Sequence, residues 1–246
     1  MQMGPISQSQ MNLNESCPHA WYYYRIHAPS IVRDTSYADL GTVLHKSIAE
    51  YYGIIHDNPH EGEIEGTYKQ VLDRHWTQHE SNLKALVSRK DKCVANFLNF
   101  EKTRMKSGGN YKPTLVEGNI TGIINRIEYR SIVDAYWIDS GTAVDWKTGN
   151  KVILEAPDYI QGQVTIMILR SFGYPVNRFL FVSLLAGTVL ELPKVEDAFV
   201  EVRAMKMIDH WNKGEFPKNK NPQSCQWCNW ILRCDMEDKG YCVWQL

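Results

Sequence analysis

The stretch of residues 131–149 constrains the fold of this chain more than any other. It holds two short apolar runs, at residues 132–138 and 142–146, and the turn-forming sequence Asp-Ser-Gly separates them. Short apolar runs on either side of such a turn are typical of a β-hairpin. The sequence therefore predicts two antiparallel strands, joined by a tight turn, at this point in the chain.

Charged side chains interrupt both predicted strands. Because side chains alternate along a strand, Asp145 and Lys147 share one face, away from their apolar neighbours. A two-residue turn at Ser140 and Gly141 would place Asp134 opposite Lys147, on that same face. Packing gives no reason to gather two carboxylates and an ammonium group on a sheet, because dehydrating them is costly. A divalent cation supplies that reason, so the hairpin predicts a metal site.

The length and charge of the chain limit what it can be. Its 246 residues suffice for one large domain, or for a domain with an appended subdomain. The formal net charge is −1, so binding of nucleic acid must come from a local patch or a bound metal. No apolar run approaches the length of a membrane span, and the polar start lacks the apolar core of a signal peptide. We therefore expect a soluble, cytoplasmic protein in a reducing environment, without membrane contact.

One predicted helix carries a histidine that has room to reach a neighbouring element. Apolar residues recur at spacings of three and four over residues 36–55, which predicts an amphipathic helix. His45 lies beside this apolar stripe, between the small residues Gly41 and Ala49 on the same face. A lone helical histidine is commonly structural or solvent-exposed, and that alternative stays open here.

The other expected elements give the chain a mixed α/β order. The period of the apolar residues changes to two from residue 115, which indicates strands leading into the hairpin. A further helix follows Pro157 and runs to about residue 172. The remaining expectations are a polar lead-in at 1–12, a helix opening near Cys17 and Pro18, a polar loop at 56–66, helices at 67–80, 83–106 and 195–211, and strands at 179–185 and 189–192.

The cysteines near the C-terminus predict a second metal site. Cys225, Cys228 and Cys234 are arranged as C-x2-C-x5-C. Two cysteines separated by two residues can chelate one metal centre, and a third nearby thiol makes accident a poor explanation. The spacing leaves the fourth ligand open. Cys242 would complete a local zinc site, whereas Cys17 would tie the N-terminal segment to the C-terminal one.

Taken together, these motifs resemble a known family. Asp134, a gap of ten residues and then Asp-x-Lys-Thr-Gly at 145–149 resemble the signature of the PD-(D/E)XK nuclease superfamily, in particular its RecB-like exonucleases. Residues 40–45 resemble the Gly-x-x-x-His segment of those nucleases. The resemblance implies an α/β, restriction-endonuclease-like core with a mixed central sheet flanked by helices. It also implies a site in which His45, Asp134, Asp145 and the backbone carbonyl of Trp146 hold Mg²⁺ or Mn²⁺. Lys147 and Gln163 would act in catalysis beside the two aspartates.

Two further positions resemble the family in part. Gln163 matches the first position of a Gln-apolar-apolar-apolar-Tyr motif, but Met167 stands where that motif has Tyr. The substrate contact of that Tyr is therefore in doubt. Glu117 resembles an acidic residue that assists the metal site in some members, and a surface strand residue accounts for it equally well.

The cysteines resemble those of a particular group within the superfamily. Their spacing, with one cysteine before the nuclease core and three after it, resembles the iron–sulfur site of AddB and of the CRISPR-associated Cas-four-type exonucleases. The resemblance implies a 4Fe–4S cluster held by Cys17, Cys225, Cys228 and Cys234, with zinc and Cys242 as the alternative. It divides the chain into an N-terminal segment at 1–35, a nuclease core at 36–215 and a C-terminal iron–sulfur segment at 216–246.

The implied function is that of a metal-dependent DNA exonuclease acting on single strands or duplex ends, in CRISPR adaptation, phage recombination or DNA repair. The expected partners are DNA and proteins of a CRISPR or recombination complex. Two alternatives stay open: a non-catalytic DNA-binding adaptor of the same fold, and a zinc-stapled endonuclease. The adaptor would be free to lose Asp134, Asp145 and Lys147, and all three are present.

Overall fold

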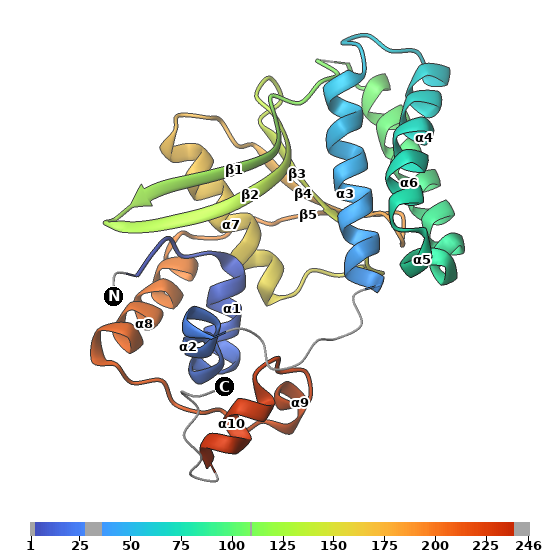
Figure 1. Ribbon diagram of the computed structural model, residues 1–246. Coiled ribbons are helices and arrows are strands. Elements are labelled where there is room, and N and C mark those ends of the chain that lie inside the picture. Colours follow the sequence, from blue (N-terminus) through green and yellow to red (C-terminus); the bar gives the residue numbers. More distant parts are fainter. Residues whose placement is uncertain (1–2, 28–35, 109, 239–246) are drawn as a thin grey trace.

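The computed structural model describes residues 3–27, 36–108 and 110–238, which form a five-stranded sheet with helices on both faces (Figure 1). The mixed α/β order expected from the sequence is confirmed. The strands are β1 (Leu115–Ile124), β2 (Ile127–Trp137), β3 (Thr142–Lys147), β4 (Arg178–Ser183) and β5 (Thr188–Glu191). The helices are α1 (Gln8–Ser16), α2 (Pro18–Ile26), α3 (Ser36–Ile54), α4 (Glu61–Gln78), α5 (Glu80–Leu83), the 3-10 turn η1 (Lys84–Leu86), α6 (Val87–Lys106), α7 (Ala156–Ser171), α8 (Ala198–Lys213), α9 (Pro222–Cys225) and α10 (Ile231–Asp238).

The sheet has the strand order β1-β2-β3-β4-β5, and its pairing is mixed. Strands β1, β2 and β3 are consecutive and antiparallel, so the predicted hairpin is present. Strands β3 and β4 are parallel, since α7 carries the chain from one to the other. Strand β5 returns antiparallel at the edge. This topology sets β3, with Asp145 and Lys147, in the middle of the sheet.

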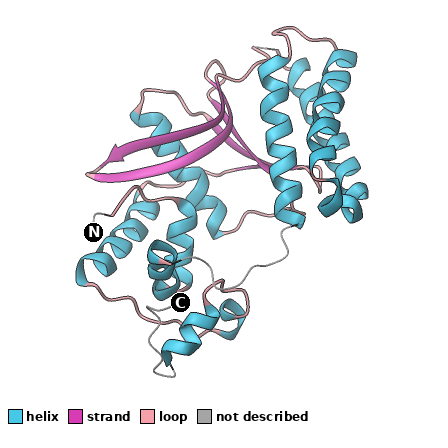
Figure 2. Cartoon of the chain, in the orientation of Figure 1, coloured by secondary structure: helices cyan, strands magenta, loops and turns pink. Residues whose placement is uncertain are grey.

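Two helical layers cover the two faces of the sheet (Figure 2). Helices α1, α7 and α8 share one core with the strand residues Ala143 and Phe181. Helices α3, α4 and α6 share the other core with Val144 and Trp146. Ala143 and Val144 are neighbours on β3, so the two cores lie on opposite faces of the same central strand. None of the described helices combines the length and apolar character that crossing a membrane requires.

The prediction of a polar lead-in at residues 1–12 is wrong for the part that the structure describes. Ile6 forms a parallel bridge with Tyr129 of β2, and Met11 is fully buried. The hydroxyl of Ser7 accepts a hydrogen bond from the backbone N–H of Gln10 and caps α1. A polar segment docks here because β2 offers backbone partners and two apolar side chains fill the core. The helix expected at Pro18 is present as α2.

Helix α4 begins earlier than the sequence analysis predicted. Its first residue is Glu61, because Nδ1 of His60 accepts a hydrogen bond from the backbone N–H of Glu63 at 3.1 Å and caps the helix. Ile64 in the first turns is fully buried. The predicted polar loop is therefore wrong for residues 61–66. Acidic side chains in the first turn of a helix interact favourably with the helix dipole. They also make this segment polar, which is why the sequence suggested a loop.

The two ends of the described chain pack against each other, with α9 and α10 beside α1 and α2 (Figure 1). The side chain of Asn219 donates a hydrogen bond to the carbonyl of Ser16 at 2.8 Å, across 203 positions of sequence. The backbone N–H of Asn219 points to Sγ of Cys17 at 3.5 Å. Nε2 of His19 is 2.9 Å from the carboxylate of Glu237. These contacts hold α9 and α10, which we call the terminal subdomain, against the N-terminal helices, outside the sheet.

Candidate metal centre and active site

The hairpin register differs from the one that a two-residue turn would give. The backbone pairs between β2 and β3 leave the four residues 138–141 in the connection. Gly141 in this connection has a φ of 62°, which a residue without a side chain adopts easily. Continuing the observed register sets Asp134 opposite Asp145. The predicted pairing of Asp134 with Lys147 is therefore wrong, and the two carboxylates are the cross-strand neighbours.

The alternation of side chains between the two faces of the sheet is interrupted at Glu117 on β1 and at Asp134 on β2. The ladder pairs the neighbours of these two residues on both sides but leaves them out. Val133 packs in the core on the α7 side and Ala135 in the core on the α3 side, although regular alternation would put both on one face. Glu117 has a φ of 45°, an uncommon conformation for a residue with a side chain. Backbone strain of this kind is concentrated at functional sites.

His45, Glu117 and Asp134 form what we call the metal-binding group. Their ligand atoms lie within 4.8 Å of one another, and no other such trio was found in the part of the chain that the structure describes. Nδ1 of His45 is 3.1 Å from Oε1 of Glu117 and 3.5 Å from Oδ2 of Asp134. Nε2 of His45 is 2.9 Å from the carbonyl oxygen of Trp146. Three elements, α3, β1 and β2, therefore converge on the exposed end of β3.

Two local features hold this arrangement. Gly41 lies one turn before His45, and a Cβ there would come within 3.3 Å of Oγ1 of Thr148. The lack of a side chain lets α3 approach the end of β3, so that His45 reaches the strand. The backbone N–H of Trp146 donates a hydrogen bond to Oδ2 of Asp134 at 2.7 Å, where pairing between β2 and β3 has stopped. That bond fixes the carboxylate beside the imidazole.

The ionisable groups of the site influence one another strongly. Burial raises the pKa of Asp134 well above its usual range, and the charge of Asp145 raises it further. Burial also raises the pKa of Asp145, against the opposing effect of Lys147. Burial would lower the pKa of His45, but its hydrogen bond to Glu117 and the charge of Asp134 raise it to about 9. A divalent cation would supply the positive charge that these carboxylates need, and a donor set of carboxylates plus one imidazole fits Mg²⁺ or Mn²⁺.

Lys147 and Asp145 share a face of β3, as strand alternation predicts. Nζ of Lys147 is 2.7 Å from Oδ2 of Asp145 and donates a hydrogen bond to Oε1 of Gln161, on α7, at 2.7 Å. The amide nitrogen of Gln161 donates to Oδ1 of Asp145. Gln161 therefore orients both the ammonium group and the carboxylate. The lysine side chain remains 24% exposed, so a substrate can reach it.

Gln163 does not take the position that the sequence analysis gave it. Its amide donates a hydrogen bond to Asp197, next to α8, and its side chain is buried there. An α-helix turns about 100° per residue, so the side chains of residues i and i+2 point about 200° apart. Gln161 and Gln163 therefore face different neighbours. The sequence did contain a signal for Gln161. Asp158, Gln161 and Thr165 are polar residues at spacings of three and four, which places them on one face of the helix.

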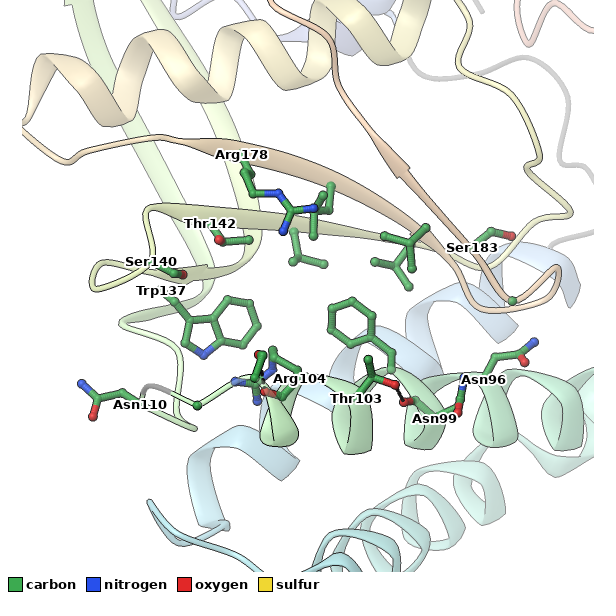
Figure 3. Close-up of a pocket in the computed structure, with 18 of the residues that line it drawn as sticks. Asn96, Asn99, Thr103, Arg104, Asn110, Trp137, Ser140, Thr142, Arg178 and Ser183 are labelled. Atoms are coloured by element: carbon green, nitrogen blue, oxygen red, sulfur yellow. Dashed lines mark hydrogen bonds between the residues drawn. The ribbon is translucent and has the colours of Figure 1, made fainter.

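The metal-binding group lines a cavity of about 550 Å³, together with Asp145 and Lys147. A larger cavity, of about 770 Å³, lies between α6 and strands β3 to β5 (Figure 3). Its wall includes Val144, which precedes Asp145 on β3 and points to the opposite face, so the larger cavity does not open onto the carboxylates. Arg104 and Arg178 in its lining each pair with a glutamate at 2.7 Å. The chemistry therefore belongs to the smaller cavity.

A further cavity, of about 430 Å³, is lined by all four cysteines of the expected iron–sulfur set. Cys17 reaches it from the break between α1 and α2, and Cys225, Cys228 and Cys234 reach it from the terminal subdomain. Trp230, 6% exposed, packs beside them. Four thiols from the two ends of the described chain therefore line one cavity, although no three of their sulfur atoms lie within 4.8 Å of one another. Cys242 lies outside the described residues.

Comparison with known proteins gives a family and a fold. The family model described as the PD-(D/E)XK nuclease superfamily matches residues 5–235, a range that contains every residue of both candidate sites. Among solved structures, a similar one is a crystal structure from Eubacterium rectale named "Putative exonuclease", with a TM-score of 0.54 and 14% identity over 92% of this chain and 93% of that chain. At that identity the likeness shows the fold alone. No curated protein matches the chain.

Proposed function

Because the chain belongs to the PD-(D/E)XK nuclease superfamily, we propose that it is a metal-dependent deoxyribonuclease that digests DNA from strand ends. One observation carries the proposal: the metal-binding group converges within 4.8 Å, beside an ion pair of Asp145 and Lys147. A cluster of carboxylates whose pKa values are raised, in a cavity and beside a lysine, is typical of a metal-assisted hydrolase.

The proposed ligands of Mg²⁺ or Mn²⁺ are His45, Asp134, Asp145 and the backbone carbonyl of Trp146. Of these, His45 and Asp134 converge with Glu117 within 4.8 Å, so we add Glu117 as a further ligand. When bound, the cation polarises the scissile phosphate and lowers the pKa of a coordinated water. His45 must give up a proton before its imidazole can coordinate. Since its pKa is raised to about 9, protons and metal compete for this side chain.

Lys147 is proposed to stabilise the negative charge that develops on the phosphate oxygens and to orient the attacking water. Its ammonium group is already held by Asp145 and Gln161, so little reorganisation is needed when substrate binds. We therefore assign to Gln161 the orienting role that the sequence analysis gave to Gln163. Gln163 stays a structural residue of the α7–α8 contact in this proposal.

Digestion from strand ends and the setting of the enzyme rest on the resemblance to RecB-like exonucleases. The support from the chain itself is the Gly-x-x-x-His segment, whose histidine lies in the metal-binding group. A role in CRISPR adaptation, phage recombination or DNA repair, and protein partners from such a complex, remain predictions. A cytoplasmic location remains a prediction as well.

For the cysteine cavity we propose a 4Fe–4S cluster held by Cys17, Cys225, Cys228 and Cys234. The support is that all four thiols line one cavity and that Cys17 comes from the opposite end of the described chain. Bound there, the cluster would tie the N-terminal helices to the terminal subdomain, so its binding free energy becomes folding free energy. Zinc, with Cys242 replacing Cys17, is the alternative.

The test is degradation of end-labelled single-stranded DNA by the purified protein in Mn²⁺, in Mg²⁺ or in EDTA. We expect degradation with metal and none in EDTA, with linear strands digested much faster than closed circles of the same sequence. Equal digestion of linear and circular strands would favour the endonuclease. Binding of DNA without cleavage in any metal would favour the non-catalytic adaptor.

A further inference from the structure

Two cavities adjoin each other at the metal-binding group. The cavity of about 550 Å³ contains Asp134 and Asp145, and a second one, of about 760 Å³, runs along α3 toward α4. His45 and Glu117 line both. We call the first the strand lobe and the second the helix lobe. Because both lobes are lined by these two residues, we treat them as adjoining parts of one groove at the metal-binding group.

The helix lobe contains one lysine that its acidic neighbour does not neutralise. Glu50 lies one turn after Lys46 on α3, at the spacing of a helical ion pair. However, its two carboxylate oxygens are already 2.7 Å from Arg74 and 2.7 Å from His75, both on α4. Lys46 is exposed, and it has no ion pair within the described part of the chain. Its charge therefore remains available to a ligand in the lobe.

The strand lobe contains a comparable arginine. Arg130 lies on β2, four residues before Asp134, which is about 13 Å along an extended strand. Its cross-strand neighbour is the uncharged Thr121, and its backbone N–H donates to Ile6. The side chain is exposed and, among the residues that the structure describes, has no ion-pair partner. Ile132, 52% exposed, lines the same lobe between Arg130 and the carboxylates.

Most, though not all, of the other described lysines and arginines lie in ion pairs, as for Lys69, Lys90 and Lys213. The net charge is only −1. A chain with so little general attraction for a polyanion needs local charges to bind one. Cations that are left unpaired in both lobes of the catalytic groove meet that need.

We propose that Lys46 and Arg130 are substrate-positioning residues that bind phosphates of one DNA strand on opposite sides of the scissile bond. This inference rests on the proposed nuclease function and specifies how its substrate lies. Phosphate contacts fix the register of a strand without reading its sequence. The exposed Ile132 offers an apolar surface on which a base next to the Arg130-bound phosphate can rest. The substrate is then a polynucleotide that extends to both sides of the metal-binding group.

The experiment measures steady-state cleavage of a labelled single-stranded oligonucleotide, in saturating Mn²⁺, by Lys46→Ala, Arg130→Ala and the double variant. Each single variant should raise KM about threefold to fivefold, the size of one exposed charge contact, and leave kcat within about twofold. Each should also reduce the slope of log KM against log salt by about 0.7, the value for one phosphate contact on a single strand. Lys46→Arg and Arg130→Lys should restore most of the affinity.

Lys92→Ala and Lys206→Ala are the matched controls, because both lysines are exposed on helices and line neither lobe. They should leave KM and the salt slope unchanged. Wild-type KM and salt slope in Lys46→Ala and Arg130→Ala, or equal effects in the controls, would overturn the proposal.

Binding of the same oligonucleotide in Ca²⁺, followed by fluorescence anisotropy, separates this inference from the nuclease function. If the wild type binds the strand in Ca²⁺ but does not cleave it in Mn²⁺, and the two variants bind more weakly, the nuclease function fails while the inference holds. If the wild type cleaves normally and the variants bind as tightly as it does, the inference fails alone.

Discussion

The two candidate metal sites of this molecule are built in opposite ways. The metal-binding group lies on strands and a long helix, where Asp134 and Asp145 are 6% and 5% exposed and are held by Trp146 and Gln161. The cysteine cavity lies between short elements, since α9 has four residues and α10 has eight. Among the described residues, three buried side chains, Ala20, Tyr23 and Trp230, form the core around it, with the partly buried Leu13 and Tyr22 packed against them.

This contrast shows that the ligands of a metal site can either lower or raise the stability of the fold. In the sheet, the fold holds carboxylates together against their repulsion and burial, so the ligands destabilise the protein until a cation binds. In the terminal subdomain the described core is small, so the proposed cluster, if bound, would add to the stability of the contact between the two chain ends. Variants of the cysteine cavity should therefore lose mainly stability, whereas variants of the metal-binding group should lose mainly activity.

The largest expected effect is the loss of stability in Cys17→Ser. A cluster linking residue 17 to residues 225–234 closes a loop of about 200 residues, which by analogy with a crosslink contributes roughly 5 kcal/mol. Protein purified without oxygen should be brown, and Cys17→Ser should lose the colour and much of its thermal stability. Cys93→Ser, a change of a buried thiol outside the cavity, should keep the colour. A colourless zinc protein that needs Cys242 rather than Cys17 would contradict the cluster.

The aspartates should show the reverse behaviour. Asp134→Ala and Asp145→Ala should each reduce cleavage by at least about two orders of magnitude, or about 2.7 kcal/mol, because each removes a metal ligand. Their melting temperature in EDTA should equal or exceed that of the wild type, since a buried carboxylate is gone. Asp139→Ala, on the connection of the same hairpin, is the control and should leave activity unchanged. A marked fall in stability would instead assign the carboxylates a structural role.

A smaller effect separates the two glutamines of α7. Gln161→Ala should lower kcat about tenfold, because Lys147 and Asp145 lose the side chain that orients them. Gln163→Ala should lower stability, since it leaves Asp197 without its hydrogen bond, and should keep kcat near the wild-type value. The reverse result, with kcat sensitive to Gln163 alone, would restore the assignment made from the sequence.

The smallest expected effect is a pH dependence of stability without metal. The pKa of His45 is raised from 6.5 to about 9, so the stability it contributes is complete below pH 6.5 and is lost as the pH rises through 9. The pKa values of Asp134 and Asp145 are raised as well, so ionisation of these carboxyl groups also lowers the stability as the pH rises, beginning at a lower pH. The melting temperature in EDTA should therefore fall by about 3 °C or more between pH 6.5 and 9. Saturating Mn²⁺, which competes with the protons, should reverse the slope, and His45→Ala should flatten it.

Much of the site followed from local rules that the sequence displays. Strand alternation alone put Asp145 and Lys147 on one face, and the structure pairs them at 2.7 Å. The spacing of Gly41 and His45 indicated a histidine that could leave its own helix, and Gly41 does allow α3 to approach β3. Such features depend on neighbours within a few residues, so a single sequence can reveal them.

The errors arose where distant parts of the chain decide the outcome. The register of Asp134 depends on a four-residue connection and on a change of faces at Glu117, which strand periodicity does not encode. The choice between Gln161 and Gln163 depends on how α7 is rotated between the sheet and α8. The docking of α1 depends on backbone partners that β2 provides.

The central claim is that the end of β3 is a metal-dependent hydrolytic site, and Lys147→Ala tests it most directly. The measurement is the rate of degradation of end-labelled linear single-stranded DNA in saturating Mn²⁺, with folding checked by the melting temperature. The variant keeps every proposed metal ligand, so we predict a normally folded, metal-binding protein whose rate is lower by about two orders of magnitude or more. A folded Lys147→Ala protein that degrades DNA at the wild-type rate would contradict the account.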